Sequence, residues 1–317
     1  MLVDGKWTDA WQPVQAKDSA GRFVRQQSSF RHWVTVDGSA GPMGDAGFMA
    51  EPGRYHLYAA YICPWASRTL MARTLKKLDD IITVDILNPV LTDQGWRFGG
   101  YPGSNADSLG SATYLHEIYT ASDPHYTGRA TVPVLYDKQR QTIVNNESAD
   151  IVRMLNAAFN RWGDAAVDLR PLALSAQIDA LNGSIYDSLN NGVYKAGFAS
   201  SQGAYEEACL AVFKTLDELE ERLSTGGPYL FGAALTESDI RLFVTLVRFD
   251  AAYHGLFKCN LRRLTDYRNL TAYMNRVLDC DGIAATVNID HIKAGYYSIK
   301  ALNPNGIVPL GPSDWRG

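Results

Sequence analysis

The chain has 317 residues, which is enough for two domains of ordinary size. It has 46% hydrophobic residues, 20% charged residues and a formal net charge of −4, so it lacks the basic excess of a nucleic-acid-binding protein. No run approaches the roughly 18 apolar residues of a membrane span, and the N-terminal stretch MLVDGKWTDAWQP lacks the pattern of a signal peptide. We therefore expect a cytoplasmic protein that binds neither nucleic acid nor membrane.

An N-terminal arm at residues 1–50 precedes the first regular pattern. The arm has no sustained period, but its aromatic residues indicate that it packs onto the rest of the chain. These residues are Trp7, Trp11, Phe23 and Phe30. The stretch RYHLYAAY (54–61) then predicts a strand, residues 64–78 have the apolar spacing of a helix, and the β-branched stretch 81–87 predicts a second strand.

An insertion at about 88–128 interrupts this β-α-β unit. It is rich in Gly, Pro, Asn and Ser, and loops of such length in compact domains are often functional. Residues 131–155 then predict a strand, a turn, a second strand and a helix that begins at about 148. We assign residues 51–160, with the insertion, to a small α/β domain.

Helical patterns replace strands after about residue 160, so we assign 161–317 to an all-helical domain. Its tail, NPNGIVPLGP at 303–312, has three prolines and cannot be helical throughout. Before a predicted helix, Thr236 and Asp239 have the spacing of a capping box, which is a structural motif. The helices are predicted at about 171–190, 204–224, 237–254 and 264–280.

Cys63 and Pro64 stand at the junction of the first strand and its helix. A cysteine at the first turn faces unpaired N–H groups and the positive end of the helix dipole, which stabilise a thiolate. Proline suits the first helical position, which needs no N–H donor. The pair therefore indicates a reactive sulfur, and the alternative is a buried structural cysteine that happens to precede a proline.

Two further features follow in chain order. In the thioredoxin-like fold a proline at the start of the third strand is cis, which here predicts a cis Pro133 and leaves the backbone of Val132 to pair with a peptide-like ligand. Ser148 can cap the next helix and offer N–H groups to a carboxylate, while Glu147 can meet an ammonium. An edge-strand proline and an ordinary capping serine are the alternatives. The three features together favour a ligand site.

Three of the four cysteines show no such context. Cys209 lies on the apolar face of its predicted helix, and neither Cys259 nor Cys280 stands at a helix start. No pair of cysteines is spaced as C-x-x-C, and none has a histidine at the spacing of zinc ligands. We therefore expect reduced thiols and no metal.

The first half of the chain resembles the glutathione transferase fold, a thioredoxin-like domain followed by a helical one. The C-P-W-A stretch at 63–66, the insertion with Trp96, T-V-P-V-L, Glu-Ser, and Tyr296-Tyr297 followed by the proline-rich tail resemble the glutathionyl-hydroquinone reductases, or Xi-class transferases. In that family a histidine often stands on either side of the paired tyrosines, whereas this chain has Gly295 and the stretch 298–300 (Ser-Ile-Lys).

The resemblance implies glutathione as co-substrate, a homodimer, and reduction of glutathionyl-hydroquinones through a mixed disulfide between Cys63 and glutathione. Ala66 stands where C-x-x-C enzymes have their second cysteine, so a second glutathione must release the first. Tyr194, Tyr253 and Tyr296 are implied to hold the hydroquinone, with Tyr194 and Tyr296 also catalytic, and core packing is the alternative for each.

The resemblance also implies that Trp96 and Arg129 bind glutathione. A loop anchor and a solvated arginine are the alternatives.

Other functions remain open from the sequence. Cys63 with Ala66 would also serve a monothiol, glutaredoxin-like deglutathionylase or a reductive dehalogenase of halogenated hydroquinones. A transferase-like assembly module without catalysis has little need of the three site features. A transferase that uses serine or tyrosine is disfavoured, because a cysteine in that place would form a disulfide with glutathione.

Overall fold

The computed structural model describes residues 1–8, 16–42 and 47–316, so Trp11 of the arm lies outside the described residues. The chain divides into two compact units, and neither is a continuous stretch of sequence. The first unit consists of Met1–Pro13, Gln27–Asp168 and Thr286–His291. The second unit consists of Val14–Gln26, Leu169–Ala285 and Ile292–Gly317.

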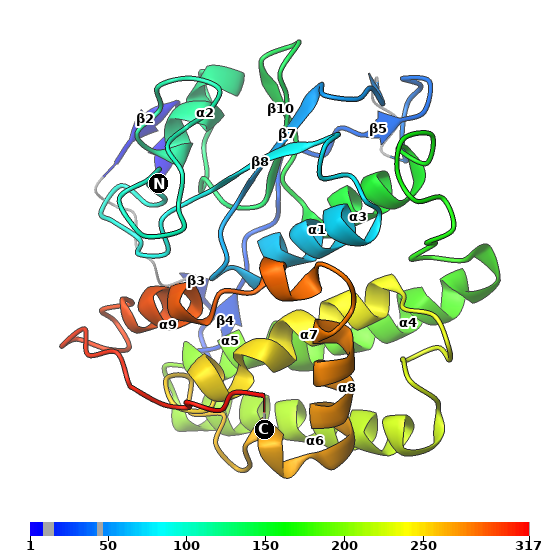
Figure 1. Cartoon of the computed structure of the whole chain (residues 1–317). Helices are drawn as coiled ribbons and strands as arrows, with labels where there is room; N and C mark the ends of the chain where they lie inside the picture. The colour runs from blue at the N-terminus through cyan, green and yellow to red at the C-terminus, as the bar shows by residue number, and fades with distance from the viewer. Residues whose placement is uncertain (9–15, 43–46, 317) are drawn as a thin grey trace. The chain divides into compact units, whose positions relative to one another are not determined.

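The first unit is built on a four-stranded sheet with the order β10-β9-β7-β8. β7 and β8 pair in parallel and the other pairs are antiparallel. The helices α1 and α3 lie side by side against this sheet (Figure 1). The bounds are Tyr55–Ala59 for β7, Pro64–Leu75 for α1, Thr83–Ile86 for β8, Val134–Asp137 for β9, Thr142–Asn145 for β10 and Ser148–Ala157 for α3.

These elements are the predicted β-α-β and β-β-α patterns, and the first one differs at its end. α1 stops at Leu75, although apolar residues at helical spacing continue to Leu78. Lys77 has a φ of 53°, in the left-handed region that ends helices. The side chain of Lys76 is buried and donates to the Asn160 side chain (2.8 Å) and to the Val167 carbonyl (2.5 Å).

The insertion contains a helix that its composition did not predict. α2 (Leu115–Ser122) packs against β10, and Glu117 caps it by accepting from the backbone N–H of Tyr114 (3.0 Å). Within the same unit the buried His291 donates from Nε2 to the Pro102 carbonyl (2.7 Å). The insertion is therefore a folded part of the unit, held by specific contacts.

The arm forms short strand pairs in both units. In the first unit β1 (Leu2–Val3) pairs with β2 (Lys6–Trp7), and β5 (Val34–Thr35) pairs with β6 (Phe48–Met49). In the second unit β3 (Ala16–Lys17) pairs with β4 (Phe23–Val24). The arm's described aromatic residues pack on the rest of the chain, as predicted, with ring contacts from Trp7 to His116, from Phe23 to Phe198 and from Phe30 to Tyr119.

The second unit is helical, and it contains the capping box predicted from Thr236 and Asp239. Asp239 accepts from the backbone N–H (2.7 Å) and the hydroxyl (2.8 Å) of Thr236, from the backbone N–H of Leu230 and from the Tyr273 hydroxyl (both 2.9 Å). The described helices are η1 Leu172–Leu174, α4 Ser175–Ile185, η2 Tyr186–Asn190, α5 Gly192–Gly197, α6 Gln202–Thr225, α7 Glu237–Arg248, η3 Phe249–Tyr253, η4 Leu264–Asp266, α8 Arg268–Leu278, η5 Ile283–Thr286 and α9 Ile289–Tyr297, of which η5 and the first residues of α9 extend into the first unit.

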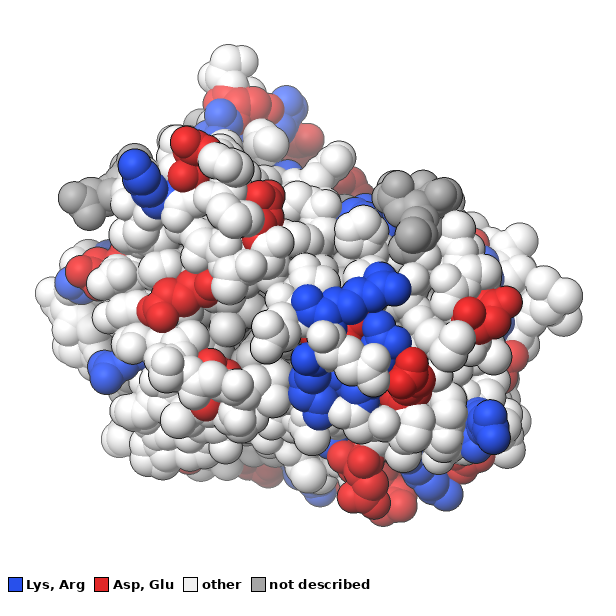
Figure 2. Space-filling view, turned by 90° about the horizontal axis from the view of Figure 1, so that it is seen from above, with Lys and Arg blue, Asp and Glu red and all other residues white. Residues whose placement is uncertain are grey.

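The charged surface shows no broad area of one sign on the face drawn in Figure 2. One group of basic side chains lies beside acidic ones near the centre of that face, other charged side chains are scattered, and most of the face is uncharged. Within the described ranges, no helix combines the length and apolar character that crossing a bilayer requires.

Candidate functional site

Cys63 is the N-cap residue of α1, and Pro64 is the first helical residue. The thiol is half-buried and donates to the Val132 carbonyl at 3.5 Å. The Cys63 carbonyl accepts from the backbone N–H (3.0 Å) and the hydroxyl (3.1 Å) of Ser67, so the first turn is closed behind it. The sulfur therefore lies at the N-terminus of a helix, where a thiolate is stabilised.

The Val132–Pro133 peptide bond is cis, as predicted. The thiol of Cys63 and the carbonyl of Val132 meet at this turn although they are 69 residues apart. Next to it, Tyr119 of α2 donates its hydroxyl to the Thr131 carbonyl (2.7 Å) and accepts from the Thr131 N–H (3.1 Å). The insertion helix therefore supports the turn that precedes β9.

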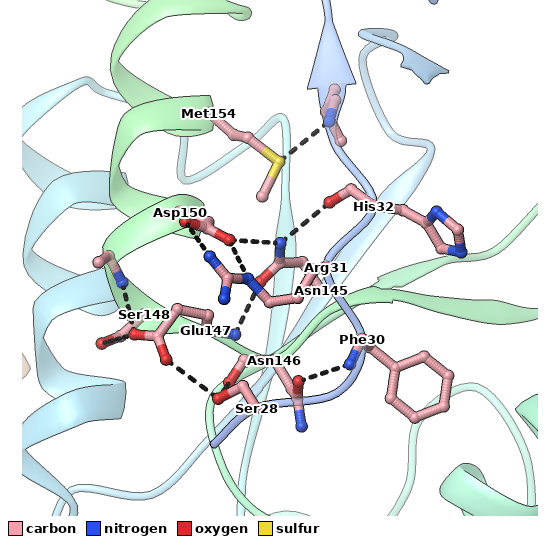
Figure 3. Close-up of polar contacts among 12 residues, drawn as sticks. Ser28, Phe30, Arg31, His32, Asn145, Asn146, Glu147, Ser148, Asp150 and Met154 are labelled. Atoms are coloured by element: carbon pink, nitrogen blue, oxygen red, sulfur yellow. Dashed lines mark hydrogen bonds and ion pairs between the residues drawn. The ribbon is translucent and has the colours of Figure 1, made fainter. Parts of the chain in front are cut away.

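Glu147, and not Ser148, is the N-cap residue of α3. Glu147 Oε1 accepts from the backbone N–H of Ala149 at 3.2 Å. Ser148 is the first helical residue and is buried, with its hydroxyl 3.4 Å from the same oxygen. The prediction that Ser148 caps the helix is wrong, because the longer Glu147 side chain reaches the first turn instead (Figure 3).

Trp96 and Arg129 both belong to the first unit and are half-buried. The carbonyl of Trp96 accepts from the backbone N–H of Leu115 (2.9 Å), which joins its loop to α2. The carbonyl of Arg129 accepts from the Tyr126 hydroxyl (3.1 Å). The roles predicted for the two side chains stay predictions.

The second unit brings together the three tyrosines that the sequence singled out. The Tyr296 hydroxyl lies 2.5 Å from that of Tyr194 and 2.9 Å from that of Tyr253, so the three hydroxyls form a chain. Tyr253 and Tyr296 are 0% and 2% exposed, whereas Tyr194 is half-buried. We call Tyr194, Tyr253 and Tyr296 the tyrosine cluster.

Burial sets the protonation of the two inner members of the tyrosine cluster. It raises the pKa of Tyr253 and Tyr296 well above the usual value, and the nearby Tyr194 hydroxyl raises both further. The buried guanidinium of Arg248, the last residue of α7, opposes this and lowers both pKa values. Both phenols are therefore neutral near pH 7 and able to donate a proton or a hydrogen bond.

Two of the three tyrosines in the cluster lie in a π-helical turn or in the helix that directly follows one. The turns are η2, just before α5 with Tyr194, and η3, which ends at Tyr253. Such wide turns are rare and often occur at functional sites. The Phe257 ring lies 5.3 Å from the rings of both Tyr194 and Tyr253, so the phenols sit in an apolar, aromatic environment.

Arg25 is a candidate site residue beside the tyrosine cluster, and no pattern in the sequence identified it. Its guanidinium carbon lies 4.9 Å from the centre of the Tyr194 ring and 5.2 Å from that of Phe23. Its Nε donates to the side-chain carbonyl of Asn191 at 2.7 Å. The position of this arm residue depends on the pairing of β3 with β4, which gave no usable pattern in the sequence.

The remaining cysteines differ from Cys63. Burial raises the pKa of the Cys209 and Cys259 thiols, which makes them poor nucleophiles. The Cys280 sulfur lies 3.4 Å from the Tyr229 hydroxyl. All four cysteines are thiols. Among the described residues, no group of three or more His, Cys, Asp or Glu side chains is arranged to hold a metal ion.

Comparisons with known proteins identify the two halves. Residues 62–158 match the family model described as the glutathione S-transferase N-terminal domain, and residues 202–276 match that of the C-terminal domain. The chain is 50% identical over 313 residues to the glutathionyl-hydroquinone reductase YqjG of Escherichia coli (strain K12), covering 98% of this chain and 94% of that protein.

Two further relatives agree. The chain is 50% identical over 316 residues to the glutathionyl-hydroquinone reductase PcpF of Sphingobium chlorophenolicum, covering 99% and 96% of the two chains. The glutathione-bound structure of the Escherichia coli protein superposes with a TM-score of 0.90 at 48% identity, covering 98% and 95%. These matches confirm the fold class expected from the sequence.

Proposed function

The chain belongs to the glutathione transferase family, and on that premise we propose that it reduces glutathionyl-hydroquinones to free hydroquinones with glutathione as the reductant. The observation that carries the proposal is the thiol of Cys63, at the start of α1 and 3.5 Å from the Val132 carbonyl of the cis-proline turn. Among the four thiols, it alone caps a helix.

The reaction has two half-reactions. In the first, the Cys63 thiolate attacks the sulfur of the glutathionyl-hydroquinone, the bond between sulfur and the aromatic carbon breaks, and that carbon takes up a proton. Hydroquinone leaves, and Cys63 is joined to glutathione by a disulfide. In the second, the thiolate of another glutathione attacks this disulfide, giving oxidised glutathione and the Cys63 thiolate. The aromatic carbon gains the two electrons that the two sulfurs lose.

The first unit would bind the glutathione part. The backbone of Val132 would pair with the peptide, Glu147 would accept hydrogen bonds from the γ-glutamyl ammonium, and the start of α3 at Ser148 would bind its carboxylate. Trp96 would pack over the glutathione or hydrogen-bond it, and the Arg129 guanidinium would pair with a carboxylate.

The tyrosine cluster would bind the hydroquinone part. Its hydroxyls can donate to the quinol oxygens, and Tyr194 and Tyr296 would supply or relay the proton that the aromatic carbon needs. The neutral state of the buried Tyr253 and Tyr296 supports this, because a phenolate could not donate. Gly295 and residues 298–300 stand where relatives often have histidines, so the cluster would act without them.

Thiol–disulfide exchange on glutathionylated proteins is the main alternative, because Cys63 and the cis-proline turn would suffice for it. A dehalogenase of halogenated hydroquinones would use the same sulfur. The tyrosine cluster favours an aromatic substrate, since disulfide exchange needs no chain of buried phenols. An assembly module would need neither feature.

The test compares the wild type, Cys63→Ser and the control Cys209→Ser on a synthetic glutathionyl-hydroquinone with added glutathione. We expect wild type and the control to release hydroquinone and oxidised glutathione in equal amounts, and Cys63→Ser to be about 1,000-fold slower or worse. Turnover of a glutathionylated peptide alone would favour the disulfide exchange function. Inactivity on both substrates would favour the assembly module.

The reaction also bears on location and assembly. It consumes reduced glutathione, which the cytoplasm maintains, and this supports a cytoplasmic location. A homodimer stays a prediction from the family resemblance, and light scattering on the purified protein measures it.

A further inference from the structure

A segment of the arm runs along the start of α3. The backbone N–H of Asn146 donates to the Phe30 carbonyl, and the backbone N–H of Phe30 donates to the side-chain carbonyl of Asn146 (both 3.1 Å). The Arg31 guanidinium forms a two-point ion pair with Asp150 in the first turn of α3 (2.5 and 3.1 Å). Figure 3 shows these contacts on one side of the helix start. The segment is therefore held in one position by several independent contacts.

Ser28 lies in this segment, and its hydroxyl reaches the Glu147 carboxylate. Ser28 Oγ is 3.0 Å from Glu147 Oε2 and 3.2 Å from the Asn146 carbonyl. The hydroxyl has one proton, and the charged, nearer carboxylate oxygen is the stronger acceptor. Both groups are half-buried, so the contact is shielded from water on one side.

The two oxygens of Glu147 are thus fixed from two sides. Oε1 accepts from the Ala149 N–H (3.2 Å), and Oε2 accepts from Ser28. A carboxylate oxygen can accept two hydrogen bonds, so Oε2 keeps a lone pair for a ligand, whereas Oε1 also accepts from the Ser148 hydroxyl (3.4 Å). A carboxylate held in this way has lost its rotamer freedom before the ligand arrives, which lowers the cost of binding.

We propose that Ser28 is a positioning residue of the glutathione site, which holds the Glu147 carboxylate in the orientation that accepts the γ-glutamyl ammonium. The inference rests on the proposed role of Glu147. It goes beyond that role because it assigns a residue of the N-terminal arm to the glutathione site. The segment from Ser28 to Arg31 supplies the donor, and its contacts with Asn146 and Asp150 keep the donor in place.

The experiment measures glutathione binding by calorimetry in a Cys63→Ser background, where no mixed disulfide can form. Ser28→Ala is expected to weaken binding about 5- to 10-fold, and Ser28→Thr, which keeps the hydroxyl, to restore most of it. Ser29→Ala is the matched control, because Ser29 is the neighbouring serine and its hydroxyl contacts Tyr126 instead. It is expected to bind as the parent does.

Glu147→Gln supplies the decisive comparison. If Ser28 acts through the carboxylate, Ser28→Ala adds no further loss in the Glu147→Gln background. An equal loss in both backgrounds, or unchanged binding in Ser28→Ala, would overturn the inference and leave the proposed function intact. A parent that binds no glutathione would overturn both. Thermal unfolding of each variant shows whether a loss of binding comes with a loss of folding. If Ser28→Ala is unstable, and Ser28→Thr is stable but binds glutathione weakly, the result would count against the inference.

Discussion

The candidate thiol site of the first unit and the tyrosine cluster of the second unit are built from different structural parts. In the first unit, the candidate site consists of two helix starts and one cis-proline turn, so much of it is backbone fixed by neighbours in the sequence. In the second unit, three side chains from α5, η3 and α9 meet through their hydroxyl groups and pack ring against ring. The first kind of site depends on local geometry, and the second depends on how several helices pack.

This difference predicts which substitutions affect the thiol site and which affect the tyrosine cluster. Loosening the helical packing should harm the tyrosine cluster, whereas single hydroxyl deletions there should leave the chemistry of the thiol untouched. The following predictions test this separation.

Asp239→Ala is expected to have the largest effect, on the packing of the second unit. It removes the acceptor of four hydrogen bonds in a fully buried place and should lower the free energy of unfolding by about 3–4 kcal/mol. Urea unfolding followed by circular dichroism measures this. The matched control is Asp266→Ala, a capping residue on the exposed surface, which should cost about 0.5–1 kcal/mol. Equal losses would show that burial is not the cause.

Tyr296→Phe tests the cluster without disturbing its packing. It removes the hydroxyl in the middle of the chain of three and should reduce kcat on a glutathionyl-hydroquinone about 10- to 100-fold. Turnover of a glutathionylated peptide should not change, because that reaction needs no proton on carbon. Tyr297→Phe is the control, since the next residue along the chain lies outside the cluster. Equal losses on both substrates would contradict the separation of the two halves.

Arg25→Ala should have the smallest effect. Its guanidinium lies 4.9 Å from the centre of the Tyr194 ring, and a cation in that place stabilises and orients the ring modestly. We expect kcat on the aromatic substrate to fall about 3- to 10-fold, with partial recovery in Arg25→Lys. Arg22→Ala removes a surface ion pair with Glu207 in the same part of the arm and should leave kcat unchanged. An unchanged kcat in Arg25→Ala would remove Arg25 from the site.

The sequence predicted three backbone features correctly: the helix start at Cys63, the cis bond before Pro133 and the capping box at Thr236. The first and the third follow from a few adjacent residues, and the second follows from the thioredoxin-like pattern. The error at Glu147 has a local cause too. Either of two adjacent residues could cap α3, and the short serine is the commoner choice in general.

The tyrosine cluster could be named only through family resemblance. The chain has 17 tyrosines, and neither spacing nor periodicity distinguishes the three that meet. Arg25 was missed for a related reason, since the two-residue strands β3 and β4 are too short to give a pattern. The helix α2 was missed because Gly, Pro and Ser dominate the insertion around it, and eight residues give little periodicity.

The way the chain alternates between units limits how this protein can be divided. The two family-model regions, 62–158 and 202–276, look separable by one cut between them. Such a cut would leave part of each unit on the other fragment, because Val14–Gln26 belongs to the second unit and Thr286–His291 to the first. Neither fragment would contain all of its own unit. In a truncated, fused or split version of the protein, the smallest fragment that contains both complete units is therefore close to the whole chain.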